Sequence, residues 1–150
     1  MWYYKVVDDL SVIPQFIQYY TNELTTARKE VKIEGNLETN IKLLPGIVEF
    51  RFNQLEDIES VLKHLEILYD ELRVRHYKKY LEAYNRALSS RDADKYASGD
   101  KEVIEFQCLV NEVALLRNQY LAIHKGLDVK QWQLGHITKL RTVGMEDITL

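Results

Sequence analysis

Ten residues between positions 73 and 91 combine positive charge with aromatic rings. They are Arg73, Arg75, His76, Tyr77, Lys78, Lys79, Tyr80, Tyr84, Arg86 and Arg91. On a helix, spacings of three, four and seven residues place a band of cations beside a band of tyrosines. A single strand of nucleic acid can use such a surface, because its phosphates contact the cations while its bases stack on the rings at roughly 1–3 kcal/mol each. The segment therefore predicts a nucleic-acid-binding surface with little sequence preference.

A structural interpretation of the same residues stays open beside this one. The tyrosines would then continue the hydrophobic core, and the cations would form a solvated flank that faces acidic residues of this chain or of a neighbour. A second, weaker cluster lies further along the chain: His124, Lys125, Lys130, Trp132, His136, Lys139 and Arg141. It could extend the first surface, although Trp132 taken alone is more typical of a core residue.

The distribution of charge favours a local contact with a polyanion. The chain has 150 residues and a formal net charge of −3. Between positions 72 and 91, however, six Lys and Arg residues stand against one acidic residue, whereas positions 1–71 hold seven against thirteen. A mildly acidic protein with such a basic segment meets a polyanion at that segment and not over its whole surface. We therefore do not expect a basic protein that coats DNA.

No arrangement of residues typical of catalysis is recognisable. Nucleophilic chemistry needs a nucleophile, a base and an orienting group within hydrogen-bond reach. The single cysteine, Cys108, falls between apolar neighbours of an expected helix, where a buried and inert thiol is the usual finding. The six glycines are isolated from one another, so no phosphate-binding loop occurs. We therefore expect no enzymatic activity and no cofactor.

The histidines and glutamates do not have the spacing of a metal site. His124 and His136 are twelve residues apart, which fits no common ligand motif. A small all-helical enzyme of the nucleotide-pyrophosphohydrolase kind would hold Mg²⁺ with clustered glutamates, for which the candidates are Glu49, Glu56, Glu59 and Glu66. They lack the repeated E-x-x-E pair of such a site, so we expect no metal. This enzyme is kept as an alternative that a flat magnesium titration would exclude.

The chain holds only two prolines and six glycines, which predicts long helices. Residues 1–9 are β-prone and predict a short strand or an extended arm. Apolar residues at helical spacing then predict a helix from about 11 to 34. A polar connection should close at Pro45 and Gly46, and a single helix of about 40 residues should follow it.

The polar segment 89–100 predicts a reversal of the chain, with Ser98 or Asp100 capping the next helix. That helix should run from about 100 to 125 and stop at Gly126, because glycine commonly ends helices. A last short helix over 128–141 and a loose tail at 145–150 complete the expected elements. We expect all of them to form one helical domain over residues 1–150.

Apolar residues of the longest expected helix follow alternating spacings of three and four. They are Leu55, Ile58, Leu62, Leu65, Tyr69 and Leu72, and His76 continues the same spacing. This is the period of a coiled-coil seam and implies a partner helix, for which the helix over 100–125 is the obvious candidate. The sequence thus predicts an all-α fold, a long coiled-coil-like helical hairpin with shorter flanking helices. It also predicts that these seam residues form the interface of a homo-oligomer.

The order of the parts resembles a known family. A long helix ends in a basic, tyrosine-bearing segment, RHYKKYLEAYNRAL, and is followed by an acidic turn, DADKYASGDKEV, another long helix and a terminal piece, KGLDVKQWQLGHITKLR. Over roughly residues 60–142 this order resembles the UvsY-type recombination mediators of T-even-like bacteriophages. The front half, with its WYYKVV and LPGIVEFRF segments, departs from that family.

The resemblance implies a phage protein without enzymatic activity that binds single-stranded DNA as a ring-forming oligomer. Such a mediator helps to load a RecA-like recombinase in place of single-strand binding protein, and it needs no cofactor. The basic segment of these mediators corresponds here to Arg75, Lys78 and Lys79, with Tyr77 and Tyr80 beside them. Their closing lysine and tryptophan correspond to Lys130 and Trp132.

Together these features predict a single-stranded DNA-binding accessory protein that mediates phage recombination, although the residues alone fit RNA as well as DNA. Its expected partners are a RecA-like recombinase, single-strand binding protein and further copies of the chain. The predicted nucleic-acid contacts are Arg73, Arg75, Tyr77, Lys78, Lys79, Tyr80, Tyr84, Arg86, Lys130 and Trp132. The alternative is a helical phage protein that binds another protein and no nucleic acid.

The expected location follows from the absence of membrane and export signals in the sequence. No apolar run approaches the roughly 18 residues that cross a bilayer, and the opening MWYYKVVDDL lacks the features of a secretory signal. We therefore expect a cytoplasmic protein, located in the host cytoplasm if a phage encodes it.

Overall fold

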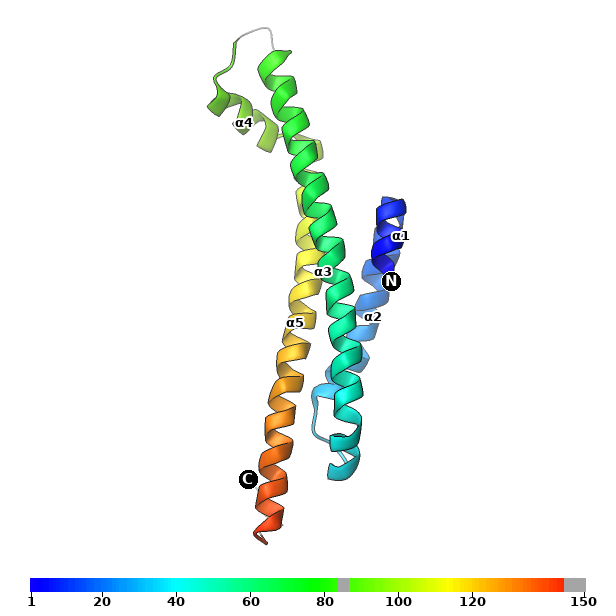
Figure 1. The fold of residues 1–150 in the computed structure, drawn as a ribbon. Coiled ribbons are helices and arrows are strands. Elements are labelled where there is room, and N and C mark those ends of the chain that lie inside the picture. The colour runs from blue at the N-terminus through cyan, green and yellow to red at the C-terminus, as the bar shows by residue number, and fades with distance from the viewer. Residues whose placement is uncertain (84–86, 145–150) are drawn as a thin grey trace. The chain divides into compact units, whose positions relative to one another are not determined.

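The chain is built of helices in a computed structural model that describes residues 1–83 and 87–144 (Figure 1). In chain order they are α1 (Trp2–Asp8), the short 3-10 helix η1 (Leu10–Val12), α2 (Ile13–Val31), α3 (Leu37–Glu82), α4 (Ser90–Ser98) and α5 (Lys101–Thr142). No strand occurs in the described ranges. The predicted all-α fold with a pair of long helices is confirmed.

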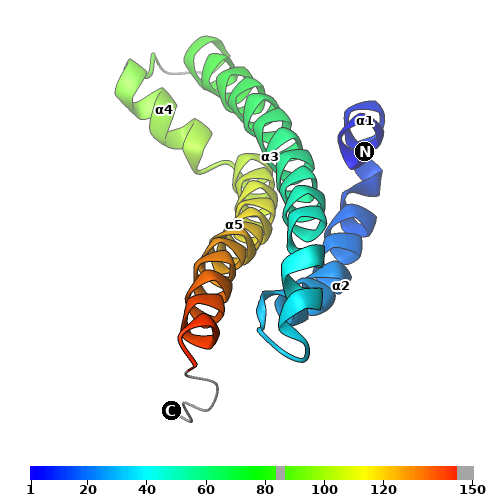
Figure 2. The same ribbon diagram turned by 60° about the horizontal axis from the view of Figure 1, so that its bottom comes forward.

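Contacts between residues divide the chain into two compact units, and each contains part of both long helices. Unit 1 comprises Met1–Ile13 and Asp57–Leu116, and unit 2 comprises Pro14–Glu56 and Arg117–Leu150. Within each unit a stretch of α3 lies beside a stretch of α5, as Figures 1 and 2 both show. A single domain over the whole chain stays a prediction.

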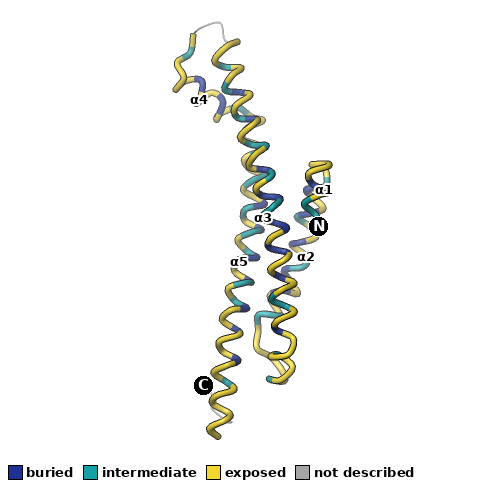
Figure 3. Tube along the Cα trace, in the orientation of Figure 1, coloured by how far each residue is buried: buried dark blue, intermediate teal, exposed yellow. Residues whose placement is uncertain are grey.

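The heptad residues of α3 are covered within the chain itself. Five of them are at most 8% exposed: Leu55, Ile58, Leu62, Leu65 and Leu72. The sixth, Tyr69, is half-buried. Buried positions, dark blue in Figure 3, recur along both long helices. The seam is therefore an internal contact, which corrects its prediction as the surface between copies. Self-association stays a prediction and requires another surface.

The N-terminal residues form the helix α1, so the predicted strand or extended arm is wrong. The amides of Trp2 and Tyr3 donate to the two carboxylate oxygens of Asp57 on α3, at 2.8 and 2.9 Å. A carboxylate at this end satisfies amides that no helical carbonyl reaches and opposes the positive end of the helix dipole. Val6 of α1 is fully buried. A contact 55 residues away along the chain thus outweighs the local β propensity.

α3 begins at Leu37, earlier than predicted, and the expected connection up to Pro45 is helical. Asn36 caps the helix, because its Oδ1 accepts a hydrogen bond from the amide of Thr39 at 3.1 Å. Pro45 lies inside the helix, where its ring nitrogen cannot donate to the carbonyl of Ile41. α3 nevertheless continues as one helix through this position.

The polar segment after α3 contains α4 where only a reversal of the chain was predicted. Ser89 caps α4, because its Oγ accepts from the amide of Asp92 at 3.2 Å. Asp100 caps α5 in the same way, accepting from the amide of Glu102 at 3.0 Å, so the predicted cap at Asp100 is confirmed. α5 then continues without a break through Gly126, which contradicts the predicted stop and the separate last helix. The predicted tail at 145–150 lies outside the described residues.

Candidate nucleic-acid interface

The C-terminal part of α3, in unit 1, presents three cations to solvent. Arg75, Lys78 and Lys79 are exposed and stand at spacings of three and four residues, which places them on one side of the helix. In the described part of the chain, none of the three has a carboxylate at ion-pair distance. We call these three residues the cation face. Their exposure is established, and their contact with phosphate groups stays a prediction.

Arg73 and Tyr80, two other predicted contacts, are engaged within the chain. Nη2 of Arg73 donates to Oδ1 of Asp94 on α4 at 2.8 Å, and this contact raises the pKa of the guanidinium. The hydroxyl of Tyr80 donates to Oδ2 of Asp100 at 3.0 Å. Both side chains therefore connect α3 to the segment that follows it, and a role in nucleic-acid binding would compete with these contacts.

The ring of Tyr80 also belongs to an aromatic pair that the sequence did not predict. It stacks on Tyr96 of α4, with ring centroids 5.5 Å apart and planes inclined by 28°. Nζ of Lys79 lies 5.8 Å from the Tyr80 ring centroid, which is within the range of a cation–π contact. Tyr96 is 48% exposed, so the pair offers an aromatic surface beside the cation face. Nothing in a spacing of 16 residues along the chain indicates this contact.

For three further predicted nucleic-acid contacts the position of the side chain does not test the prediction. Tyr77 is half-buried on α3. Tyr84 and Arg86 lie outside the described residues.

The structure contradicts the prediction for Lys130. Its side chain is buried, and Nζ donates to the backbone carbonyls of Glu30 at 2.7 Å and of Lys32 at 2.8 Å. These carbonyls end α2, where a cation both satisfies free acceptors and favours the negative end of the dipole. Burial lowers the pKa of the Lys130 ammonium. A phosphate cannot reach a group enclosed in this way, so Lys130 is a capping residue of unit 2.

Trp132, in contrast to Lys130, is exposed to solvent. Its side chain is 73% exposed on α5, so the interpretation of Trp132 as a core residue is wrong. Trp132 belongs to unit 2, whereas the cation face belongs to unit 1. Cys108 is likewise exposed and not buried as expected.

Residues that could do other chemistry gather at one place only in the described part of the chain. His76, Asp100 and Glu102 each offer a metal-ligating atom, and these atoms lie within 4.8 Å of one another. The four glutamates considered for a magnesium enzyme, Glu49, Glu56, Glu59 and Glu66, do not form such a group among the described residues. The sequence missed the cluster because His76 is 24 and 26 residues from its two neighbours.

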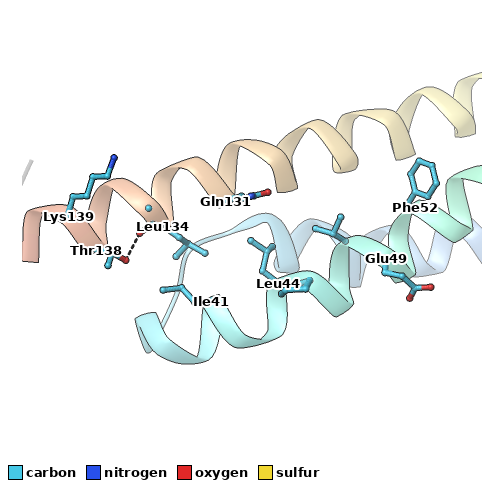
Figure 4. Close-up of a pocket in the computed structure, with 11 residues that line it drawn as sticks. Ile41, Leu44, Glu49, Phe52, Gln131, Leu134, Thr138 and Lys139 are labelled. Atoms are coloured by element: carbon cyan, nitrogen blue, oxygen red, sulfur yellow. Dashed lines mark hydrogen bonds between the residues drawn. The ribbon is translucent and has the colours of Figure 1, made fainter. Parts of the chain in front are cut away.

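Unit 2 carries an apolar groove between α3 and α5 (Figure 4). Its volume is about 820 Å³, within the range of ligand and peptide sites. The lining residues are Ile41, Leu44, Pro45, Val48, Glu49 and Phe52 from α3 and Gln131, Leu134, Gly135, Thr138 and Lys139 from α5. Ile41 is 44% exposed and Phe52 is 43% exposed, so apolar surface is left uncovered here.

None of the described helices is both long and apolar enough to span a membrane. Comparisons with family models, with curated proteins and with solved structures find no significant match for this chain. The resemblance to UvsY-type mediators therefore stays a prediction from the order of its parts.

Proposed function

We propose that the chain is a non-enzymatic protein that binds single-stranded nucleic acid through the cation face of α3. The observation that carries this proposal is the exposure of Arg75, Lys78 and Lys79 on one side of the helix without a described ion-pair partner. Three cations within about one helical turn can follow successive phosphates of a flexible strand. The exposed ring of Tyr96 lies on the adjoining α4 and offers a face for base stacking.

The acidic residues on the same helix set the strength of this binding. Glu71 precedes Arg75 by four residues, and Glu82 follows Lys78 by four, so both are on the side of the cation face. Their negative charges reduce the attraction of the cation face for phosphate. Dissolved salt screens the remaining attraction over a distance of about 8–10 Å. We therefore expect binding that is measurable at low salt, weak at physiological salt and nearly independent of base sequence.

The sharper version of this proposal is a recombination mediator, in which several copies bind one strand and assist the loading of a RecA-like recombinase. It is supported by the order of the basic segment, acidic turn and second long helix along the chain. Several weak cation faces on one strand would bind far more tightly than one, because each further contact is intramolecular.

Fluorescence anisotropy of a labelled single-stranded oligonucleotide tests the proposal. The informative variant is R75A/K78A/K79A, in which all three side chains are exposed and their loss leaves the core intact. The matched control is R28A/K29A/K63A, which removes one arginine and two lysines from exposed positions elsewhere. We expect the first variant to lose at least tenfold in affinity and the control to stay within about twofold. Equal losses in the two would show that only net charge matters.

A second candidate function, protein–protein interaction, is favoured by the apolar groove of unit 2. We propose a second copy of the chain as its occupant, because the α3 seam is internal and the groove leaves apolar surface uncovered. Glu49 and Lys139 are the two charged residues that line it, and they come from different helices (Figure 4). In a two-fold dimer each contact between the copies occurs twice, once in each direction. Glu49 of each copy can therefore face Lys139 of the other.

Sedimentation equilibrium tests this self-association. We expect the wild-type chain to be a multimer and the variant I41E/F52E to be a monomer, because both substitutions place charge in the groove. The control is I67E, which introduces the same charge at an exposed isoleucine of α3 in unit 1. A monomeric wild-type chain, or equal dissociation by I67E, would leave the groove to a different protein or to a small apolar ligand.

A further inference from the structure

Among the described residues of the basic segment 73–91 that carry charge or an aromatic ring, His76 is the one that is buried. It is 8% exposed, whereas its neighbour Arg75 is exposed. Its Nε2 lies 2.8 Å from Oε2 of Glu102, at hydrogen-bond distance. Its Nδ1 lies 3.3 Å from Oδ2 of Asp100 but is buried without a hydrogen bond. One ring nitrogen is therefore satisfied, and the other faces a carboxylate without a bond to it.

The contact with Glu102 decides the tautomer of a neutral His76 ring. A carboxylate only accepts hydrogen bonds, so Nε2 must carry the proton that is donated to Glu102. The lone pair is then on Nδ1, directed toward the Asp100 carboxylate, which also offers only lone pairs. Two acceptors 3.3 Å apart in a buried place are unfavourable unless a proton or a metal ion lies between them.

We propose that His76 and Asp100 bind a divalent transition-metal ion, with Zn²⁺ as the closest fit. Ligand atoms in a tetrahedral zinc site are about 3.3–3.5 Å apart, since the Zn–N and Zn–O bonds are about 2.0–2.2 Å long. The observed 3.3 Å between Nδ1 and Oδ2 agrees with that separation. Imidazole nitrogen with carboxylate oxygen suits zinc better than magnesium, which prefers an all-oxygen set.

Two neighbouring groups prepare the ligands. Glu102 holds the outer ring nitrogen of His76, the arrangement by which carboxylates orient metal-binding histidines. The Tyr80 hydroxyl donates to Oδ2 of Asp100, and the amide of Glu102 donates to Oδ1, so the carboxylate is fixed in place.

The ion would join two helices of unit 1 at their ends. His76 lies near the C-terminal end of α3, and Asp100 caps the N-terminus of α5. A bound ion would therefore link the C-terminal part of α3 to the start of α5, and its binding energy would add to the stability of the folded chain. The two residues would supply two ligands of a tetrahedral set, and the remaining positions would be open to water.

Isothermal titration calorimetry with Zn²⁺ tests the proposal on the full-length C108S chain, in which the exposed thiol no longer competes for the ion. We expect one ion per chain and a higher melting temperature with zinc than with a chelator. The substitution D100N should abolish binding, because it removes the anionic ligand. E102Q should weaken binding by about 10–100-fold only, because an amide oxygen still accepts from Nε2.

H124Q is the matched control. His124 also has a buried Nδ1 without a hydrogen bond, but its single carboxylate neighbour, Asp128, lies 4.0 Å from Nε2. We expect H124Q to bind zinc as the C108S chain does. No binding at pH 7.5 would overturn the proposal. Equal loss of binding in H124Q and D100N would overturn it as well, since it would indicate adventitious zinc on several histidines.

Discussion

A Cβ atom at Gly126 would lie 2.7 Å from Cγ1 of Val31, so α5 passes the end of α2 at a distance that only glycine permits. Real Cβ atoms do not come so close to a neighbour, and the branched side chain of Val31 has little freedom to turn away. Gly126 is therefore a packing residue inside a continuous helix. Its role depends on α2, which is nearly 100 residues away along the chain, and not on the local signal for a helix end.

The substitution G126A should destabilise the chain. Overpacking at a tight contact costs about 1–3 kcal/mol, which exceeds the gain of about 1 kcal/mol from replacing glycine by alanine in a helix. The control is G46A in α3, where an added Cβ would meet nothing within 4 Å. Urea denaturation should show a lower midpoint for G126A and a higher one for G46A. A higher midpoint for both would mean that Val31 and α2 move away from the added Cβ without a loss of stability.

Lys130 should affect stability and leave nucleic-acid binding unchanged. The substitution K130M keeps the length of the side chain but removes two charge-assisted hydrogen bonds to the end of α2, each worth about 1.5–3 kcal/mol at most. We expect a loss of about 2–4 kcal/mol in the free energy of unfolding. K125M, at an exposed position five residues earlier, should change it by less than about 0.5 kcal/mol. Weaker oligonucleotide binding by K130M with unchanged stability would return Lys130 to the nucleic-acid surface.

Arg51 should be the most sensitive charged residue of unit 2. It is 2% exposed, and its guanidinium donates to both carboxylate oxygens of Glu30, at 2.6 and 2.9 Å, and to Glu23 at 3.0 Å. Burial alone would lower its pKa, but the hydrogen bonds to the two glutamates outweigh this and raise it. Removal of one partner from a buried ion pair costs about 3–5 kcal/mol, so we expect R51M to lose about 3 kcal/mol, since the glutamates are partly exposed.

Two further variants separate geometry from charge at this site. R51K keeps the charge but not the planar pair of donors, and it should fall between wild type and R51M. K101M, which breaks an exposed pair with Glu105, should cost less than about 1 kcal/mol. If thermal unfolding shows R51K to be as stable as wild type, the charge of Arg51 alone would account for its contribution to stability. The paired geometry of its two hydrogen bonds to Glu30 would then contribute nothing.

The long helices could be predicted from the sequence because their signals are local and repeated. The heptad spacing of Leu55 to Leu72 indicates α3, and the positions off this seam include the exposed cation face. The predictions are wrong where a contact between residues far apart in the sequence determines the local structure. Asp57 holds α1 as a helix although its sequence is β-prone, and Val31 makes Gly126 a contact residue.

The same distinction applies to the candidate site. Exposure of Arg75 and Lys78 follows from helix periodicity alone. Burial of Lys130 does not, because the carbonyls that it caps are about 100 residues earlier. The pairing of His76 with Asp100 and of Tyr80 with Tyr96 depends on how the chain turns after α3, for which polar residues between 89 and 100 give no specific signal.

The salt dependence of oligonucleotide binding tests the central claim most directly. Each phosphate neutralised on a single strand lowers the logarithm of the binding constant by about 0.7 per tenfold increase in salt. Three cations therefore predict a slope of about −2 for the wild-type chain and a slope near zero for R75A/K78A/K79A. A slope that is unchanged in this variant, or no binding at low salt, would contradict nucleic-acid binding by the cation face.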